Sequence, residues 1–370
     1  TPVFVPKTEI KAMERIVRAI ESAAELPLYQ EQVLSWAPEI AAFDPGPIGA
    51  LMGYDFHLGS DGPQLIEVNT NAGGAFLNVL LARAQKRCCN PSEQSAATNQ
   101  MLDRFEEAVF DMFKQEWQRQ SAVAMPNRIA IVDNDPESQF MFLEFELACQ
   151  LLQARGIDTV ILDPSELEYI DGTLTAHGQK IDMIYNRLVD FAFEDPDHVL
   201  LKQAYLEGAV VVTPNPHVHA MLANKQNLTL LSDSQILRSW GLDEAAVECL
   251  ERSVPRTKIV SRDDAAELWL TRRQLFFKPV AGHGSKGVYR GSKLTRRVFE
   301  NILDESYIAQ TFIPATERSL KIDDVVTTRK VDIRLYTYGG KLLLPAARVY
   351  QGQVTNFRTS GGGFAPVFQV

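Results

Sequence analysis

Three side chains that could bind a hard metal ion occur within the stretch 53–74: Asp55, Glu67 and Asn69. Residues 54–58 alternate between apolar and polar, residues 60–63 have turn composition, and residues 65–68 are mostly apolar, so the stretch is predicted to form a β-hairpin. Glu67 and Asn69 would share one face of their strand, and Asp55 can lie opposite them. Two carboxylates and an amide oxygen in one small volume would suit Mg²⁺, which completes its octahedron with water and substrate phosphates.

The same acids could instead lie on the solvated face of a surface hairpin. That is the ordinary explanation for one aspartate and one glutamate. It accounts less well for an asparagine in an apolar run that continues into Asn71, Ala72, Gly73 and Gly74, where small residues let backbone approach a ligand. The hairpin by itself leaves both interpretations open, and the C-terminal half of the chain bears on the choice.

Composition narrows the class of protein. The chain has 370 residues, of which 45% are hydrophobic and 23% charged, which is typical of a globular protein with two or three domains. No apolar run approaches the length of a membrane span, and the first residues lack the order of a signal peptide. The formal net charge of −10 argues against a nucleic-acid binder. The four cysteines show neither zinc-ligand spacing nor a disulfide framework, so we expect a cytoplasmic protein.

The chain divides into four stretches. Residues 8–35 and 76–120 have helical periodicity and flank the hairpin. Strands predicted at 128–132, 159–162, 180–185 and 209–213 alternate with helices, which is typical of a parallel α/β domain. A smaller unit begins near residue 221, and a hairpin over 332–338 and 341–350 is predicted near the end of the chain.

Two charged residues follow the third strand of the parallel domain. Arg187 and Asp190 fall where the carboxyl ends of strands in an open sheet commonly bind ligands. They could hold the charged ends of a substrate, or they could simply pair with each other. The sequence does not separate these two possibilities.

A glycine loop follows Lys278 and consists of Gly282, Gly284, Ser285 and Gly287 with their intervening residues. The loop lies between two predicted strands, so it does not open the helix that a dinucleotide-binding fold requires. In a protein kinase the lysine follows the loop, whereas here it precedes it. The loop is either a surface hairpin or a flap whose backbone N–H groups bind polyphosphate. Lys278 lies in an apolar run and would be costly to bury without an anionic partner, which favours the phosphate site.

Together with Lys225 and the C-terminal arginines, these residues resemble the ATP-grasp superfamily of ATP-dependent ligases, over residues 50–74 and 224–370. The resemblance implies that ATP lies between two α+β subdomains. It assigns phosphate binding to Lys225, Lys278 and the glycine loop, and the adenine and ribose to the hinge residues Gln310, Phe312 and Ile313 and to Glu317. It assigns Mg²⁺ to Asp55, Glu67 and Asn69, and the γ-phosphate and acyl group to Arg334, Arg348 and Arg358.

The order of these motifs is unusual for the superfamily, because the metal hairpin normally follows the arginine strands. A circular permutation that moves the end of the chain to its front would explain the order, and eukaryotic-type glutathione synthetase has the same rearrangement. Glutathionylspermidine synthetase is a further, remote relative. The chain departs from the glutathione synthetase pattern at Ala281, where that enzyme has an acid ahead of its glycines. The match therefore supports the permuted scaffold more than any substrate.

We therefore predict an α/β protein with a permuted ATP-grasp core and a parallel α/β substrate domain. Residues 1–125 would hold the metal hairpin and its helices, 126–220 the substrate domain, 221–310 the small lid subdomain, and 311–370 the remaining core strands. The implied activity is an ADP-forming, ATP- and Mg²⁺-dependent carboxylate–amine ligase that forms an acyl phosphate on an amino acid or peptide. Its partners would be small-molecule carboxylate and amine substrates rather than nucleic acid or a membrane. The sequence does not decide whether the protein forms a homodimer.

Two other classes compete with the ligase. A small-molecule kinase of the same fold would use the same nucleotide residues but would phosphorylate a hydroxyl. A nucleotide-binding module without activity would usually have lost a metal ligand or a phosphate lysine, and this chain keeps all of the candidates.

Overall fold

A seven-stranded sheet forms the centre of the computed structural model, which describes residues 2–88, 96–282, 287–322, 325–353, 355, 357 and 361–370. The strand order is β1-β18-β17-β16-β2-β3, and β15 pairs with β16 beside this path. The strands are β1 (Val3–Val5), β2 (Met52–Gly59), β3 (Gly62–Asn69), β15 (Thr316–Ile322), β16 (Val325–Tyr338), β17 (Lys341–Tyr350) and β18 (Gly363–Gln369). The predicted hairpin at 53–74 and the predicted pair at the end of the chain are thus neighbours in one sheet.

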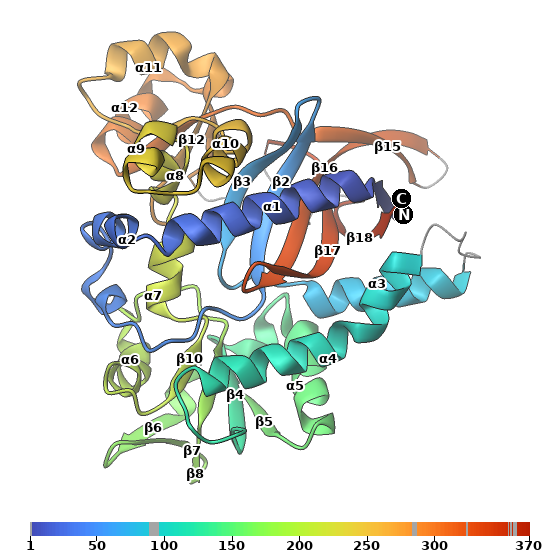
Figure 1. The fold of residues 1–370 in the computed structure, drawn as a ribbon, viewed down its shortest axis with the longest axis vertical. Helices are drawn as coiled ribbons and strands as arrows, with labels where there is room; N and C mark the ends of the chain where they lie inside the picture. The colour runs from blue at the N-terminus through green and yellow to red at the C-terminus, as the bar shows by residue number, and fades with distance from the viewer. Residues whose placement is uncertain are drawn as a thin grey trace.

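The two faces of this sheet carry different side chains because successive residues of a strand point to opposite sides. Ile333 and Leu335 of β16 pack in the core that contains α1 (Lys7–Ala24). Tyr336 and Tyr338 belong to the core on the other face, with α3 (Ala75–Cys88) and α4 (Ala96–Gln118). In Figure 1, α1 crosses the sheet on one side and α3 and α4 lie on the other. Asp332 and Arg334 precede these tyrosines on the same face, where charge replaces apolar packing.

The two ends of the chain meet in this sheet. β1 pairs in parallel with β18, and Val3 is in register with Val367. The N–H of Lys7 donates to the carbonyl of Val370 at 2.9 Å, and the N–H of Val370 donates to the carbonyl of Val5 at 3.0 Å. Figure 1 shows the N and C labels side by side. Such closure is what a circular permutation requires, although the sequence pattern had predicted neither β1 nor β18.

The parallel α/β prediction is confirmed. The strands β4 (Arg128–Val132), β5 (Asp158–Leu162), β9 (Met183–Asn186) and β10 (Val211–Thr213) form a parallel sheet in the order β10-β9-β4-β5. Its helices include α5 (Phe142–Ala154) and α6 (Val199–Leu206). The sequence prediction missed a small antiparallel sheet of β6 (Leu167–Ile170), β7 (Thr173–Ala176) and β8 (Gln179–Lys180). These strands have two to four residues, which is too short for a clear alternating pattern.

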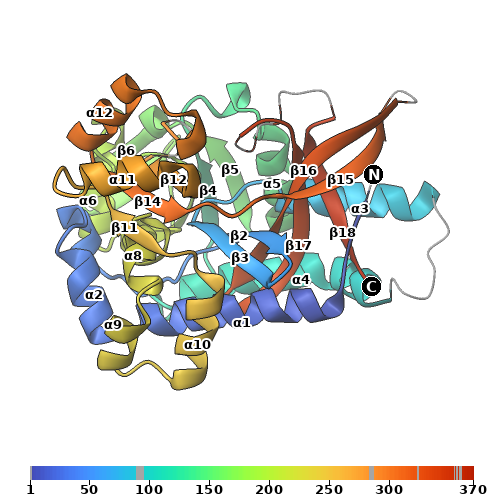
Figure 2. The same cartoon turned by 90° about the horizontal axis from the view of Figure 1, so that it is seen from above.

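A fourth sheet carries the glycine loop. The strands β11 (Thr257–Ile259), β12 (Leu275–Pro279), β13 (Tyr289–Arg290) and β14 (Tyr307–Thr311) are antiparallel, in the order β11-β14-β12-β13. Around this lid sheet lie α8 (Asn227–Leu231), α9 (Ser234–Ser239), α10 (Glu244–Ser253), α11 (Ala265–Thr271) and α12 (Arg296–Asp304). The prediction that the loop joins two strands is confirmed. In both views these elements lie at one end of the β2–β3 hairpin (Figure 1 and Figure 2).

Helix boundaries differ from the prediction in one place. The predicted helix over 8–35 is divided into α1 and α2 (Pro27–Leu34), because Pro27 starts a new helix at its first position. The predicted break near residues 90–91 lies outside the described residues. Among the described residues, no helix combines the length and the apolar character needed to cross a membrane.

Two buried glutamates join the α/β domain to the central sheet. Glu144 of α5 accepts hydrogen bonds from the N–H groups of Gly74, Phe76 and Leu77, at 3.1, 3.1 and 3.0 Å, and so caps the N-terminus of α3. Glu116 of α4 accepts from residues of three segments, namely Ile48, Gly49, Thr213 and Tyr338. Burial raises the pKa of both carboxyls, while these donors act in the opposite direction. Each glutamate therefore holds loops in place around the start of β2 and the end of β3.

Replacing Glu144 by alanine should lower the free energy of unfolding by about 3 kcal/mol, because three buried N–H groups at a helix start lose a charged acceptor. Urea unfolding would measure the change. Glu146→Ala on the same helix is the control, and its effect should stay within about 0.5 kcal/mol. Equal effects for the two variants would contradict the capping role of Glu144.

Candidate functional site

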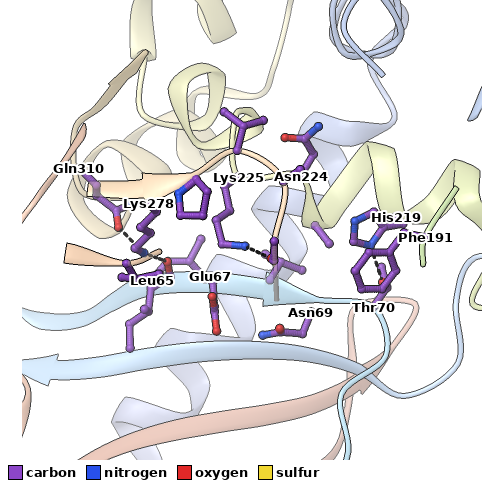
Figure 3. A pocket seen from close by; sticks show the side chains of 18 of the residues that line it. Leu65, Glu67, Asn69, Thr70, Phe191, His219, Asn224, Lys225, Lys278 and Gln310 are labelled. Atoms are coloured by element: carbon purple, nitrogen blue, oxygen red, sulfur yellow. Dashed lines mark hydrogen bonds between the residues drawn. The ribbon is translucent and has the colours of Figure 1, made fainter. Parts of the chain in front are cut away.

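A cavity of ≈ 480 Å³ lies where the central sheet, the lid and the α/β domain meet. β3 runs along it, and Figure 3 shows the order of its side chains. Leu65 lies near the lid residue Lys278, Glu67 and Asn69 lie in the middle, and Thr70 lies beside the α/β domain. At about 3.3 Å per residue, the strand and the residues after it cover roughly 20 Å of cavity wall.

The predicted hairpin is confirmed, and Asp55 lies opposite Glu67 as expected. β2 and β3 are antiparallel, and Asp55 is paired with Glu67, while Gly53 is paired with Asn69. The Nδ2 atom of Asn69 donates to Oδ2 of Asp55 at 3.0 Å. Because a carboxylate only accepts, this bond directs the amide oxygen of Asn69 away from Asp55. Glu67 and Asn69 both line the cavity.

Asp55 has a different environment from the one predicted. It is fully buried and does not line the cavity. Its Oδ1 accepts from Nε of Arg334 at 2.6 Å, and its Oδ2 accepts from Nη2 of Arg334 at 2.7 Å and lies 2.8 Å from Nη2 of Arg348. Burial alone would raise the pKa of Asp55, but the two arginines lower it below its usual range. Asp55 is therefore an anion whose oxygens are already bonded to arginines, and a metal would have to displace these partners.

Asp332 completes a buried network of four charges. It accepts from Nε and Nη2 of Arg348 at 2.6 and 3.0 Å, and from the hydroxyl of Thr355 at 2.9 Å. Cross-strand register creates both ion pairs, since Arg334 faces Asp55 and Arg348 faces Asp332. Two aspartates and two arginines give no net charge. Arg348 and Asp332 line the cavity, whereas Arg334 lies behind them.

The two predicted phosphate lysines lie on the opposite wall. Lys278 is 5% exposed, and its Nζ donates to the carbonyl of Ile66 and to Oε1 of Gln310, both at 2.8 Å. Burial lowers the pKa of Lys278 to about 8, although Glu67 acts in the opposite direction. The Nζ of Lys225 donates to the carbonyl of Gly282 at 2.8 Å, at the start of the glycine loop. Both lysines line the cavity.

The end of the cavity nearest the lid is flat and mostly apolar. The rings of Phe276 and Phe312 are nearly parallel, with centroids 6.1 Å apart, and the guanidinium of Arg290 lies 4.2 Å from the Phe312 centroid. Ile313 also lines this end. The predicted hinge residues Gln310, Phe312 and Ile313 are therefore all at the cavity.

His57 was not singled out from the sequence, yet it lines the same end. Its Nδ1 lies 3.1 Å from the carbonyl of Ile313, so this nitrogen carries the proton, and Nε2 accepts from the hydroxyl of Tyr350 at 3.3 Å. Burial lowers the pKa of His57 to about 4, so the ring is neutral near pH 7. The residue holds the hinge to β2.

The remaining predicted site residues either do not line the cavity or lie outside the described residues, apart from Gly287, which makes one hydrogen bond near it. Glu317 is exposed on β15 in register with Lys330, and Lys330 lines the cavity but Glu317 does not. The carbonyl of Gly287 accepts from the hydroxyl of Tyr307 at 2.9 Å. Gly284, Ser285 and Arg358 lie outside the described residues, so their predicted roles stay predictions.

The end of the cavity beside the α/β domain contains residues that the sequence analysis did not single out. His219 lines the cavity and stacks on Phe191, with centroids 3.6 Å apart and planes 7° apart. The Oγ1 atom of Thr70 lies 2.9 Å from its Nδ1. These residues come from three segments without a common spacing, so no sequence pattern could have joined them. Arg187 and Asp190 do not pair: Arg187 donates to the carbonyl of Asn71 at 2.8 Å, and Asp190 is bonded to His198 at 2.7 Å.

Comparisons with known proteins agree with this architecture. A scan against protein-family models and a search of curated proteins each found no match. Among solved structures, the chain is similar to a glutathione synthetase-like effector from Globodera pallida, with 11% identity and a TM-score of 0.61 over 100% of this chain and 89% of that chain. It is also similar to a putative gamma-glutamylcysteine synthetase from Methylobacillus flagellatus KT, with 11% identity and a TM-score of 0.58 over 99% of this chain and 89% of that chain.

At this level of identity, the likeness shows the fold and nothing finer. The chain has the fold of glutathione synthetase-like proteins, which confirms the predicted circularly permuted ATP-grasp scaffold.

The buried charge network gives a sharp test of stability. Asp55→Ala should lower the free energy of unfolding by about 3–5 kcal/mol, because it leaves Arg334 buried without its anion. Adding Arg334→Met should restore part of this loss, since Arg348 keeps Asp332 as its partner. Urea unfolding of the wild type, both single variants and the double variant gives the coupling energy, which should exceed about 2 kcal/mol. Simple additivity of the two losses would show that the pair is not the stabilising unit.

Proposed function

We propose that the protein is an ADP-forming, ATP- and Mg²⁺-dependent ligase that joins a carboxylate to an amine through an acyl phosphate. The observation that carries the proposal is the order of groups along β3. Figure 3 shows Gln310 and Lys278 at one end of the cavity, Lys225 above Glu67 and then Asn69 in the middle, and Thr70 with His219 at the other end. Arg348 lies near Glu67, because it contacts Asp55, which is in register with Glu67. This order matches a base, its phosphates, a phosphoryl-transfer point and an organic substrate.

The chemistry of the donor set fits a magnesium ion completed by its substrate. Glu67 supplies one carboxylate and Asn69 one amide oxygen, and Mg²⁺ is usually bound by one or two carboxylates together with water and phosphates. The described residues contain no cluster of three or more His, Cys, Asp or Glu that could hold a metal alone. Asp55 is left out of this set because its oxygens are bonded to Arg334 and Arg348. When bound, the ion would neutralise charge on the phosphates.

The nucleotide would lie between the lid and β3. Its base would fit against Phe312 and the hinge backbone, and its phosphates would take the place of the carbonyl partners of Lys225 and Lys278. Backbone N–H groups of a glycine loop can bind the same phosphates. The full set of residues proposed for the nucleotide is Lys225, Lys278, Gly282, Gly284, Ser285, Gly287, Gln310, Phe312 and Ile313, and Glu317 is left out because it does not line the cavity.

The chain itself would position groups rather than form a covalent intermediate. A substrate carboxylate oxygen attacks the γ-phosphorus, the bond to the β-phosphate oxygen breaks, and ADP leaves. The amine then attacks the acyl carbon, inorganic phosphate leaves, and the amine loses a proton to solvent. Arg348 faces the cavity with its orientation set by Asp332 and Asp55, so it is preorganised to donate to the transferring phosphoryl group. Arg334 would support it from behind, and Arg358 is proposed for the acyl phosphate.

The two similar structures are named for glutathione synthetase and gamma-glutamylcysteine synthetase, and these names accord with the ligase class. They do not decide the substrates of this chain.

The proposal is tested by turnover. The purified protein would be incubated with ATP, Mg²⁺ and pools of amino acids, peptides and polyamines, and ADP, AMP, phosphate and new amide products would be separated. ADP and phosphate should form only when a carboxylate and an amine are both present. Glu67→Gln should reduce this turnover by at least about 10²-fold, because it removes a charge that acts on the phosphates in the transition state.

Glu107→Gln, an exposed change on α4, is the control and should leave turnover unchanged. If a phosphorylated product forms without an amide, the proposed ligase activity is wrong and the protein is a kinase. If the protein binds ATP without any turnover, it is a nucleotide-binding module and not an enzyme. If Glu67→Gln keeps full activity, the proposed role of Glu67 at the site is wrong.

The pKa of Lys278 predicts how ATP binding depends on pH. Its pKa of about 8 means that the ammonium is charged below that pH and loses its proton above it. Phosphate binding favours the charged form, so the affinity for ATP should be steady below pH 8 and then fall by up to about tenfold per pH unit. Titration calorimetry from about pH 7 to about pH 9.5 would measure it. Lys278→Arg stays charged throughout, so an equal fall in that variant would contradict the assignment.

A further inference from the structure

The cavity continues beyond Asn69 into a lobe that the nucleotide and phosphate sites do not use. Thr70 and three segments form it: the loop and turn that follow α2, the loop after β9, and the stretch after β10. Most of its lining side chains are apolar or aromatic: Trp36, Pro38, Ile40, Ala41, Val189, Phe191, Ala192, Pro216, Ala220 and Ala223. This lobe, called the far lobe below, thus has the lining of a pocket for an apolar group.

One wall of the far lobe is an ordered pair of flat rings. Phe191 and His219 are stacked with centroids 3.6 Å apart and planes 7° apart. The Nδ1 atom of His219 is bonded to Thr70 at 2.9 Å. Figure 3 shows the three side chains together at the end of the cavity away from Gln310. Within the part of the chain that the structure describes, Nε2 of His219 has no hydrogen-bond partner, so it remains available to a ligand.

The backbone links this wall to the proposed chemistry. His219 begins a π-helical turn, His219–Ala223, in which the N–H of Asn224 donates to the carbonyl of His219 at 3.2 Å. Lys225 follows directly, so one short segment presents His219 to the far lobe and Lys225 to the glycine loop. Thr70 in turn follows the proposed metal ligand Asn69. Turns of this kind occur frequently at functional sites because they re-aim neighbouring side chains.

The charges on the far lobe have one sign. Its ionisable lining residues, among those described and apart from the neutral His219, are Asp190 and Glu194. Asp190 accepts from the N–H of Asp195 at 2.8 Å and from His198 at 2.7 Å, which fixes it as an anion at the rim. Because Asp190 is paired with His198, the repulsion of an acidic substrate side chain comes from Glu194, while an apolar side chain would be buried.

Resting on the proposed function, we infer that the far lobe binds the organic substrate through a large aliphatic or aromatic side group, and that Nε2 of His219 hydrogen-bonds the substrate. The substrate class is therefore an amino acid or peptide with a bulky apolar side chain next to the reacting group. Phe191 selects this side group by shape and burial. His219 is a positioning residue, because it orients the substrate without touching the transferred phosphoryl group.

The first test is a substrate series. Phenylalanine, leucine, glycine and glutamate, each free and as the terminal residue of a dipeptide, would be supplied with ATP, Mg²⁺ and the pooled co-substrates, and ADP release would be measured. The value of kcat/KM for phenylalanine or leucine should exceed that for glycine and glutamate by about 30-fold or more. A ligase that prefers glycine or glutamate would overturn this inference and leave the proposed function intact. No ADP release with any combination would count against the proposed function itself.

The second test separates positioning from packing. Phe191→Ala should raise KM for the preferred substrate at least about tenfold and leave KM for ATP within about twofold. His219→Phe keeps the stacked ring but loses the nitrogen, and His219→Gln keeps a hydrogen-bonding group. The substrate KM should rise in His219→Phe and recover partly in His219→Gln.

Phe140→Ala is the matched control, since Phe140 is 78% exposed and does not line the cavity. Thermal unfolding of every variant would identify any loss of fold, and the glutamine variant preserves the test if the phenylalanine variant is unstable. Wild-type substrate KM in His219→Phe, or an equal rise of the ATP and substrate KM values in Phe191→Ala, would overturn the inference.

Discussion

The buried ion pairs of Arg334 with Asp55 and of Arg348 with Asp332 are the constraint on which the site depends. Taking such charges out of water is expensive, and the cost is offset only if every charge meets its partner in good geometry. Here the partners are cross-strand neighbours on β2, β16 and β17, so the register of the sheet and the pairing of the charges enforce each other. A slip of one residue would send these side chains to the opposite, apolar face.

This network also decides which groups are free to act. The arginines compensate the negative charge of Asp55, and Asp55 orients the amide of Asn69 so that its oxygen is available. Asp332 and Asp55 together fix Arg348 at the cavity wall. Arg348 can then meet an anion without reorganising, which is the usual source of electrostatic stabilisation in phosphoryl transfer. Glu67 is left as the one carboxylate of the hairpin with a place on the cavity.

The lid is attached to the central sheet through polar contacts that a ligand can replace. Lys278 reaches from β12 to the carbonyl of Ile66 on β3, and Lys225 reaches to Gly282. His57 joins β2 to the hinge carbonyl of Ile313. Lys278 therefore bridges the two walls, whereas the contact of Lys225 with Gly282 lies within the lid. Burial of the Lys278 ammonium favours an anionic partner over a carbonyl oxygen.

Local patterns determined much of this protein. Alternation and turn residues indicated the β2–β3 hairpin, the strand–helix rhythm indicated the parallel domain, and the apolar run around Lys278 indicated a buried cation. These signals are visible in sequence because each depends on neighbours within a few residues. The strands β1 and β18 were not predicted, because β1 has only three residues and β18 contains Gly363 and Pro366, which are unfavourable in strands.

Tertiary structure alone decided the partners of each charge and the shape of the far lobe. Asp55 has the residue type of a metal ligand, but its pairing with Arg334 and Arg348, which are distant in the sequence, makes it their counter-ion. Thr70, Phe191 and His219 meet because three segments that are distant in sequence converge, and no spacing along the chain encodes that meeting. Residue type and local periodicity set what a side chain can do, whereas contacts between distant segments, made only when the chain folds, select which of those possibilities is used.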